Sequence, residues 1–199
     1  MDKDTFIHDT AEVSAQAQLG AGCKIWNLVQ IRENTAIGAG TIISKNCYVD
    51  FAVTIGERVK IQNNVSVYHG VTIEDEVFVG PCVVFTNDLR PRAVAPDWQV
   101  TPTLIEKGAS LGANCTIVCG TTIGNYAMIA AGSVVTRSVA PHVLVAGNPA
   151  KAIAYVYKNG SKVMPEHVTG VKDNQIVYQH PQDGEVLNID KDRLKLLPR

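Results

Sequence analysis

A six-residue period dominates this sequence and limits the folds that it can adopt. Every sixth residue from Ile7 to Phe85 is a large apolar residue, through fourteen consecutive hexads. The fifth residue of the first thirteen hexads is small or β-branched, as in Ala11, Cys23 and Thr35. A helix repeats every 3.6 residues and a strand every two, so neither explains this pattern. A fixed period of six predicts a parallel β-helix, in which each hexad is a short strand followed by a turn.

The same period gives the size of one coil. Three hexads close a triangular coil of eighteen residues, and parallel pairing stacks the coils about 4.8 Å apart. One coil cannot bury its own apolar face, so stability comes from its neighbours. Roughly seven coils fit between Ile7 and Val139. Gly20, Gly38 and Gly56 are spaced by eighteen, which places them on one corner, where a turn favours a residue without a Cβ.

The period breaks once, at residues 86–104. Twenty residues separate Phe85 from Ile105, two more than a coil, and the hexads then resume at Ile105, Leu111, Ile117, Ile123, Ile129 and Val135. Three prolines in the break predict an irregular loop. Such a loop is either merely tolerated on a solenoid surface or functional. We favour a loop that covers a ligand or embraces a neighbouring subunit, because long loops in compact domains are more often functional.

The eighteen-residue coil predicts which side chains stack. Glu33, Phe51, His69 and Asn87 are spaced by eighteen and form one column. His69 and Asn87 are therefore expected one rung apart, about 4.8 Å, at the root of the loop. One interpretation is a solvated corner histidine. We favour a catalytic site, because a titratable group, an amide and the base of the loop converge there.

Composition excludes several classes of protein. The net charge is −1, so bulk charge gives no reason to expect a nucleic-acid partner. No apolar run approaches the roughly 18 residues of a membrane-spanning helix, and the start of the chain is too polar for a signal peptide. We expect a cytoplasmic protein without membrane insertion.

The cysteines predict structural thiols. Of five cysteines, Cys23, Cys47 and Cys115 fall at small inward positions of the repeat. A free thiol there behaves as a small buried apolar group, as in proteins of a reducing cytosol. The sequence contains no C-x-x-C pair, and Cys115 with Cys119 does not form a ligand set. No metal is expected.

The chain divides into two predicted parts. Residues 1–140 form the β-helix domain, with the loop insertion at 86–104. Residues 141–199 form an exit segment and a small β appendage, because GVKDNQIVYQH and GEVLNID have the character of short strands with turn signals. We expect this appendage to serve packing or oligomerisation.

The hexads and the segment GSVVTRSVAPHVLVAGNPAKAI (132–153) resemble the left-handed β-helix, or hexapeptide-repeat, acyltransferase superfamily. The left hand of the helix is implied by this resemblance and not by the spacing. The resemblance also implies a homotrimer with sites between subunits, and acyl transfer from coenzyme A. The acyl donor expected here is acetyl-CoA.

Three segments resemble a narrower group: residues 24–38, 59–88 and 108–124. They are similar to N-acetyltransferases that modify a 3-amino-3-deoxy sugar carried on UDP or dTDP, for O-antigen, lipopolysaccharide or other bacterial surface polysaccharide. The triplet FTN (85–87) resembles the place where relatives position the acceptor amine with an asparagine. The resemblance thus implies a catalytic role for Asn87, and the eighteen-residue column places His69 beside it as the other catalytic candidate.

The remaining candidates follow from position and from the same resemblance. Some substrate-binding candidates resemble residues that line the sugar-nucleotide site of relatives: Arg32, Glu33 and Asn64. The others lie beside His69 and Asn87 or in the loop: Tyr68, Asp88 and Arg90. In relatives, the pantetheine arm lies along corners of small residues, which here are Gly112, Ala113, Ala130, Ala131 and Gly132. Arg137 and Lys151 are the cations expected to meet the phosphates of the coenzyme.

Two departures from the family pattern bear on the chemistry. Many relatives carry Glu at the position of His69, which leaves two mechanisms open. Either neutral His69 is the general base, or Asn87 alone orients the amine and water takes the proton. Relatives also often end in a cysteine-bearing tail, whereas residues 157–199 contain no Cys.

Other functions compete with this prediction. The acceptor can instead be a 4-amino sugar or a hydroxyl group, or the chain can be a non-catalytic scaffold. A zinc hydratase on the same scaffold would need about three His ligands. Only His69 lies within the repeats, because His8, His142, His167 and His180 lie at the ends of the chain.

Overall fold

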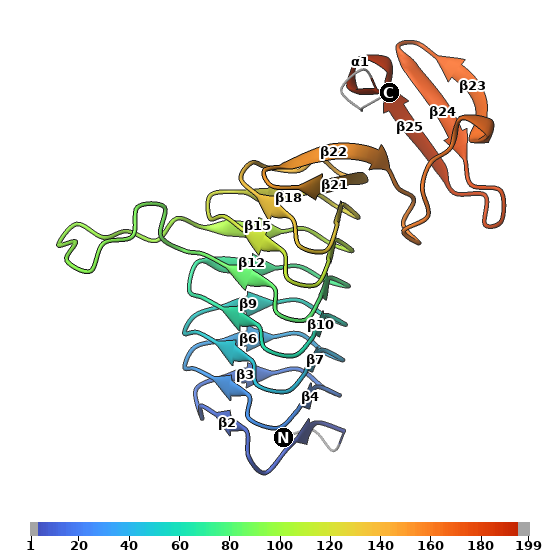
Figure 1. Cartoon of the computed structure of the whole chain (residues 1–199). Coiled ribbons are helices and arrows are strands. Elements are labelled where there is room, and N and C mark those ends of the chain that lie inside the picture. The colour runs from blue at the N-terminus through green and yellow to red at the C-terminus, as the bar shows by residue number, and fades with distance from the viewer. Residues whose placement is uncertain (1–3, 195–199) are drawn as a thin grey trace.

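The computed structural model describes residues 4–194 and shows a parallel β-helix of stacked triangular coils (Figure 1). Almost every hexad contributes a two-residue strand to one of three sheets. The first sheet contains β1 (Phe6–Ile7), β4 (Lys24–Ile25), β7 (Ile42–Ile43), β10 (Lys60–Ile61), β13 (Phe78–Val79), β16 (Ser110–Leu111), β19 (Met128–Ile129), β21 (Val143–Gly147) and β22 (Ala150–Tyr155).

The other two sheets complete the triangle. The second contains β2 (Glu12–Val13), β5 (Gln30–Ile31), β8 (Tyr48–Val49), β11 (Ser66–Val67), β14 (Val84–Phe85), β17 (Thr116–Ile117) and β20 (Val134–Val135). The third contains β3 (Gln18–Leu19), β6 (Ala36–Ile37), β9 (Thr54–Ile55), β12 (Val71–Ile73), β15 (Thr103–Ile105) and β18 (Thr122–Ile123). The predicted all-β solenoid is therefore confirmed.

The register confirms the eighteen-residue coil. Ile25 pairs with Ile43, and Ile43 pairs with Ile61, each eighteen residues further along the chain. The leading residues of the hexads from Ile25 onward are buried and form one continuous core. Cys23, Cys47 and Cys115 are buried among them, as predicted. Each sheet therefore buries a column of aliphatic side chains, which supplies most of the apolar burial that stabilises the fold.

The glycines at one corner are required by close stacking. A Cβ on Gly38 would lie 2.5 Å from the backbone nitrogen of Glu57 in the next coil, and one on Gly20 would lie 2.5 Å from that of Ala39. Neither glycine has a positive φ. The corner therefore excludes a side chain because two backbones approach closely, and not because the turn is left-handed.

The insertion occupies a single corner. The chain leaves the second sheet after Phe85 and resumes in the third sheet, where Ile105 pairs with Ile73 one rung below. Their separation is 32 residues instead of eighteen, so the loop adds fourteen residues to one coil. In Figure 1 this loop projects away from the stacked coils.

The C-terminal part first continues the helix and then leaves it. Strand β21 pairs in parallel with β19, and β22 pairs antiparallel with β21, so the first sheet extends beyond residue 140. A separate antiparallel sheet follows, made of β23 (Val168–Lys172), β24 (Gln175–Gln179) and β25 (Val186–Asp190), with the 3₁₀ turn η1 (Pro165–His167) and the helix α1 (Lys191–Leu194). The predicted appendage strands are present, while the domain boundary at 140/141 stays a prediction. Within residues 4–194, no helix has the length and apolar character needed to cross a bilayer.

Candidate active site

The predicted column at the corner between the second and third sheets exists. The imidazole of His69 stacks on the ring of Phe51, with centroids 4.2 Å apart and planes 13° from parallel. The amide nitrogen of Asn87 donates a hydrogen bond to the carbonyl oxygen of His69 at 3.3 Å. His69 and Asn87 are therefore on adjacent rungs, directly below the loop.

Hydrogen bonding defines the tautomer of His69. Its Nδ1 lies 3.1 Å from the carbonyl oxygen of Phe51. A carbonyl only accepts, so Nδ1 carries the hydrogen and neutral His69 has its lone pair on Nε2. The ring is thus oriented by a backbone partner on one side, which leaves Nε2 as the proton acceptor.

Asp50 supports this corner from inside, and the sequence did not identify it as a site residue. One carboxylate oxygen accepts hydrogen bonds from the Tyr48 hydroxyl and the Phe51 N–H, both at 2.9 Å. The other accepts from the backbone N–H of His69 at 3.2 Å. Burial favours the neutral carboxyl, but these N–H donors outweigh it and hold the pKa of Asp50 below its ordinary value. Asp50 lies eighteen residues after Arg32 and eighteen before Tyr68, and this spacing was the available signal in the sequence.

Arg32 and Glu33 lie at the same corner, two rungs below His69. The Arg32 guanidinium contacts the Glu33 carboxylate at 2.7 Å and the Asp50 carboxylate at 3.4 Å. It also lies over the ring of Phe51, 5.5 Å from the centroid. Phe51 is therefore held between a cation below and an imidazole above.

The remaining candidates at this corner are Tyr68, Asp88 and Arg90. The ring of Tyr68 packs 6.2 Å from that of Tyr48. A carboxylate oxygen of Asp88 accepts from the backbone N–H of Arg90 at 2.8 Å, which starts the loop. The Thr101 N–H donates to the Asn87 carbonyl at 3.0 Å, and this hydrogen bond closes the base of the inserted loop. The structure thus brings these three residues close to the His69 column or into the loop above it.

Asn64 and the small residues expected to bind the coenzyme lie at a different corner. Asn64 follows β10 and precedes β11, between the first and second sheets, and its side-chain oxygen accepts from Asn46 at 2.9 Å. The candidates Gly112, Ala113, Ala130, Ala131 and Gly132 stack above it on that corner. A Cβ on Gly112 would lie 2.6 Å from the backbone nitrogen of Ala131. Within one chain, this corner does not meet His69.

The two candidate phosphate partners are separated from each other. Val135 pairs with Ile117 and Ile117 with Phe85, so Arg137 stands on the His69 corner, two rungs above Asn87 or about 10 Å. Lys151 lies in β22, paired with Ala146 at the end of the stack. Both side chains are exposed.

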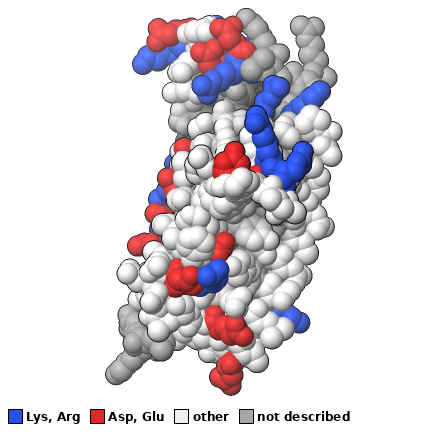
Figure 2. All heavy atoms as spheres, turned by 90° about the vertical axis from the view of Figure 1, so that its left-hand side faces the viewer, with Lys and Arg blue, Asp and Glu red and all other residues white. Residues whose placement is uncertain are grey.

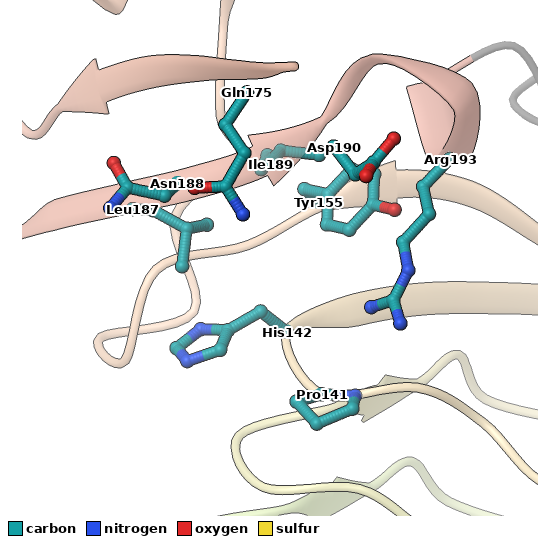
Figure 3. A pocket seen from close by; sticks show the side chains of 9 residues that line it. All are labelled: Pro141, His142, Tyr155, Gln175, Leu187, Asn188, Ile189, Asp190 and Arg193. Carbon is teal, nitrogen blue, oxygen red and sulfur yellow. The ribbon is translucent and has the colours of Figure 1, made fainter. Parts of the chain in front are cut away.

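A pocket of about 270 Å³ lies at the far end of the solenoid, against the appendage (Figure 3). It is lined by Pro141, His142, Tyr155, Gln175, Leu187, Asn188, Ile189, Asp190 and Arg193. His142 is held by a contact between its Nδ1 and the carbonyl oxygen of Val156 at 3.0 Å. None of the predicted site residues lines this pocket.

Charge on the loop-bearing face is sparse. Figure 2 views the molecule from the side of the loop, and much of the surface over the stacked corners is uncharged, with charged side chains in small separate groups. Among residues 4–194, no group of three or more His, Cys, Asp or Glu side chains is arranged to hold a metal ion.

The comparison with family models identifies the class of protein. The model described as bacterial transferase hexapeptide (six repeats) matches residues 52–87 and 102–137. A second model, hexapeptide repeat of succinyl-transferase, matches residues 29–69. Residues 29–87 and 102–137 therefore carry the hexapeptide repeat of these transferases, as the sequence predicted.

Individual relatives are similar over parts of their length. The dTDP-3-amino-3,6-dideoxy-alpha-D-galactopyranose 3-N-acetyltransferase of Aneurinibacillus thermoaerophilus is 48% identical over 77 residues, which cover 39% of this chain and 37% of the relative. Serine acetyltransferase 2 of Arabidopsis thaliana is 34% identical over 156 residues, which cover 78% of this chain and 40% of the relative. The chain therefore spans about two fifths of the length of these curated relatives.

Among solved structures, the chain is similar to a hexapeptide-repeat acetyltransferase from Vibrio cholerae O1 biovar eltor. That structure is a complex with acetyl coenzyme A. The identity is 29% and the TM-score 0.55, and the match covers 61% of this chain and 70% of that chain.

Proposed function

We propose that this protein transfers an acetyl group from acetyl-CoA to the amino group of a 3-amino-3-deoxy sugar carried on UDP or dTDP. The matches to hexapeptide transferase models support group transfer, and the structure of the similar Vibrio cholerae acetyltransferase is a complex with acetyl coenzyme A. The Aneurinibacillus relative, a 3-N-acetyltransferase of a dTDP-linked 3-amino sugar, supports an amino-sugar acceptor. A role in surface polysaccharide synthesis is part of the proposal and rests on the resemblance of residues 24–38, 59–88 and 108–124.

The observation that carries the proposal is the juxtaposition of His69 and Asn87. His69 presents a free Nε2, because Nδ1 faces the Phe51 carbonyl. Asn87 uses its amide nitrogen on the His69 carbonyl, so its side-chain oxygen is free to accept a hydrogen bond. An imidazole nitrogen that can take a proton and an amide oxygen that can orient an amine, on adjacent rungs of one column, suit a nucleophile that must lose a proton as it reacts.

The reaction then proceeds by direct attack. The free amine, oriented by the Asn87 oxygen, forms a bond to the thioester carbonyl carbon. The π electrons of the C=O bond move to oxygen and give a tetrahedral oxyanion. Backbone N–H groups at the corner stabilise this oxyanion. Nε2 of His69 takes the proton from the nitrogen, the C–S bond breaks, and the coenzyme leaves as thiolate, which then takes up a proton.

Site assembly in this proposal requires more than one copy of the chain. The His69 corner and the small-residue corner at Gly112 and Ala131 are separate edges of one triangle. A homotrimer would place the His69 corner of one copy against the small-residue corner of the next, which completes a site for both substrates. Sedimentation at several protein concentrations tests this arrangement, and a stable monomer that retains activity would contradict it.

The function is tested by thiol release from acetyl-CoA. A panel of UDP- and dTDP-linked 3-amino and 4-amino sugars is offered in turn, with the non-aminated sugar nucleotides as controls. We expect turnover with a 3-amino acceptor and loss of at least about 100-fold in His69→Ala, the lower range for general-base catalysis. Near-normal kcat in His69→Ala across pH would leave Asn87 and water as the proton-handling groups.

The serine acetyltransferase match favours one second candidate, acetyl transfer to a hydroxyl group. The same His69 base would serve it, because a hydroxyl also loses a proton as it attacks. The non-aminated sugar nucleotides in the panel separate the two candidates, since only the second candidate predicts turnover of an acceptor that has hydroxyl groups and no amine.

A further inference from the structure

The inserted loop encloses a pocket of its own. The outgoing segment (88–90) and the returning segment (95–101) line a space of about 260 Å³, with Asp88, Leu89, Arg90, Asp97, Trp98 and Gln99 among its residues. The pocket begins next to Asn87, because Asp88 follows it in sequence and Thr101, also in the lining, donates to the Asn87 carbonyl at 3.0 Å.

The lining combines an aromatic face with opposite charges. Trp98 is 49% exposed, so a large part of the indole is open to a ligand. Arg90 contributes a cation, and Asp88 and Asp97 contribute carboxylates. A purely anionic ligand would meet both acidic groups. The indole calls for a flat ring, the two carboxylates for N–H or O–H donors, and the arginine for an anionic group. A nucleoside diphosphate carries all three.

The size of the pocket fits part of a ligand. Sites that enclose a whole small molecule have volumes of about 300–1,000 Å³, so a space of about 260 Å³ is enough for one end of an extended substrate. The rest of the molecule would extend along the corner toward Asn87 and His69, where the reacting amine is expected.

We infer that this loop pocket binds the nucleoside diphosphate of the acceptor, with the base stacked on Trp98 and the diphosphate near Arg90. The inference rests on the proposed function and adds the residues that recognise the carrier. The adenine of the coenzyme is the competing ligand. It is disfavoured because the pocket begins next to Asn87, the candidate residue that orients the amine, and the acceptor is the substrate that carries this amine.

Fluorescence gives a direct test, because the chain has two tryptophans, Trp26 and Trp98. In a full-length Trp26→Phe variant, Trp98 is the only indole. We expect UDP or dTDP to change its emission saturably, and ADP and coenzyme A to have no comparable effect. A response to coenzyme A and ADP alone would overturn the inference.

Kinetics gives the second test. Base stacking on an aromatic side chain corresponds to about 5- to 150-fold in affinity by alanine substitution. Trp98→Ala should therefore raise the KM for the sugar nucleotide within that range, with kcat and the KM for acetyl-CoA nearly unchanged, and Trp98→Phe should restore much of the loss. Val94→Ala is the matched control, since Val94 is 88% exposed in the same loop and does not line the pocket.

The outcomes separate this inference from the proposed function. Turnover of a nucleotide-linked amino sugar with an unchanged KM in Trp98→Ala would overturn the loop pocket and keep the function. Absence of any calorimetric binding of UDP or dTDP to the full chain, together with turnover of a free acceptor, would overturn both.

Discussion

The imidazole of His69 lies parallel to the ring of Phe51, eighteen residues earlier, at a centroid distance of 4.2 Å. The backbone carbonyl of Phe51 also faces Nδ1 of the same imidazole at 3.1 Å. One residue of the coil below therefore positions both the plane and the tautomer of the candidate base. Sequence spacing predicted the neighbour, and the structure shows what the neighbour does.

Phe51→Leu should lower kcat while the fold persists. The substitution keeps the apolar bulk and the backbone carbonyl but removes the stacked ring, whose contribution is about 0.5–1.5 kcal/mol. We expect a decrease in kcat of about 2- to 13-fold, since a less ordered imidazole spends less time near the reacting amine. Steady-state kinetics with saturating substrates measures it.

The control for this prediction is Phe78→Leu. Phe78 is 39% exposed and Phe51 38%, so the two substitutions remove rings of similar exposure. Phe78 lies in the first sheet, away from the His69 corner. Equal kinetic losses in both variants would contradict a positioning role for Phe51.

Asp50 should make the free energy of unfolding depend on pH in the acidic range. Despite its burial, hydrogen bonds from the Phe51 and His69 N–H groups hold the pKa of Asp50 below its ordinary value. A carboxylate with a lowered native pKa contributes stability that is present above its unfolded pKa of about 3.9 and is lost as pH falls through the native pKa. Asp50→Asn should therefore destabilise the protein at pH 7 and progressively less as the pH falls below about 4.

Urea unfolding at several pH values measures this difference. Asp9→Asn, in an exposed turn of the first coil, is the control for removing one negative charge. A constant difference between wild type and Asp50→Asn from pH 7 to pH 3 would show that the lost stability does not come from the ionised carboxylate.

The sequence predicted the scaffold because the repeat is arithmetic. Residues eighteen apart pair in the coils that precede the inserted loop, so the stacking of Phe51, His69 and Asn87 follows from numbering alone. The burial of Asp50 does not follow from the numbering, because a polar residue at a turn position is normally expected to face solvent. In the folded structure, the Tyr48 hydroxyl and the backbone N–H groups of Phe51 and His69 converge on its carboxylate.

The loop and the corners mark the other limit of the prediction. Asn64 precedes Val67 and His69 follows it, so the two lie on different corners of one coil, although the resemblance grouped them in one site. Residues 88–102 have no period, and hence no register from which the pocket around Trp98 could be derived.

The cysteines should differ sharply in reactivity. Burial raises the pKa of the Cys47 thiol to about 11 and that of Cys115 to about 12, so little thiolate exists at neutral pH. Cys82 is partly exposed, whereas the other four are buried. We expect Ellman's reagent to label one thiol quickly in the native protein and the rest only on unfolding. The fast phase should disappear in Cys82→Ser, and rapid labelling of Cys115 would contradict the structure.

Gly38→Ala should destabilise the β-helix, although replacing glycine by alanine in unstrained backbone usually stabilises a protein by restricting the unfolded chain. A Cβ at this position would lie 2.5 Å from the Glu57 nitrogen and 2.5 Å from the Gly56 carbonyl carbon, both backbone atoms of the next coil. Neither atom can move without separating two rungs, so the cost should approach the 1–3 kcal/mol of overpacked cores, about 2 kcal/mol. Gly170→Ala is the control, because no atom lies within 4 Å of a Cβ there and its φ is not positive. Chemical denaturation of both variants measures the free energy of unfolding, and a Gly38→Ala protein as stable as Gly170→Ala would show that the coils are not stacked this closely.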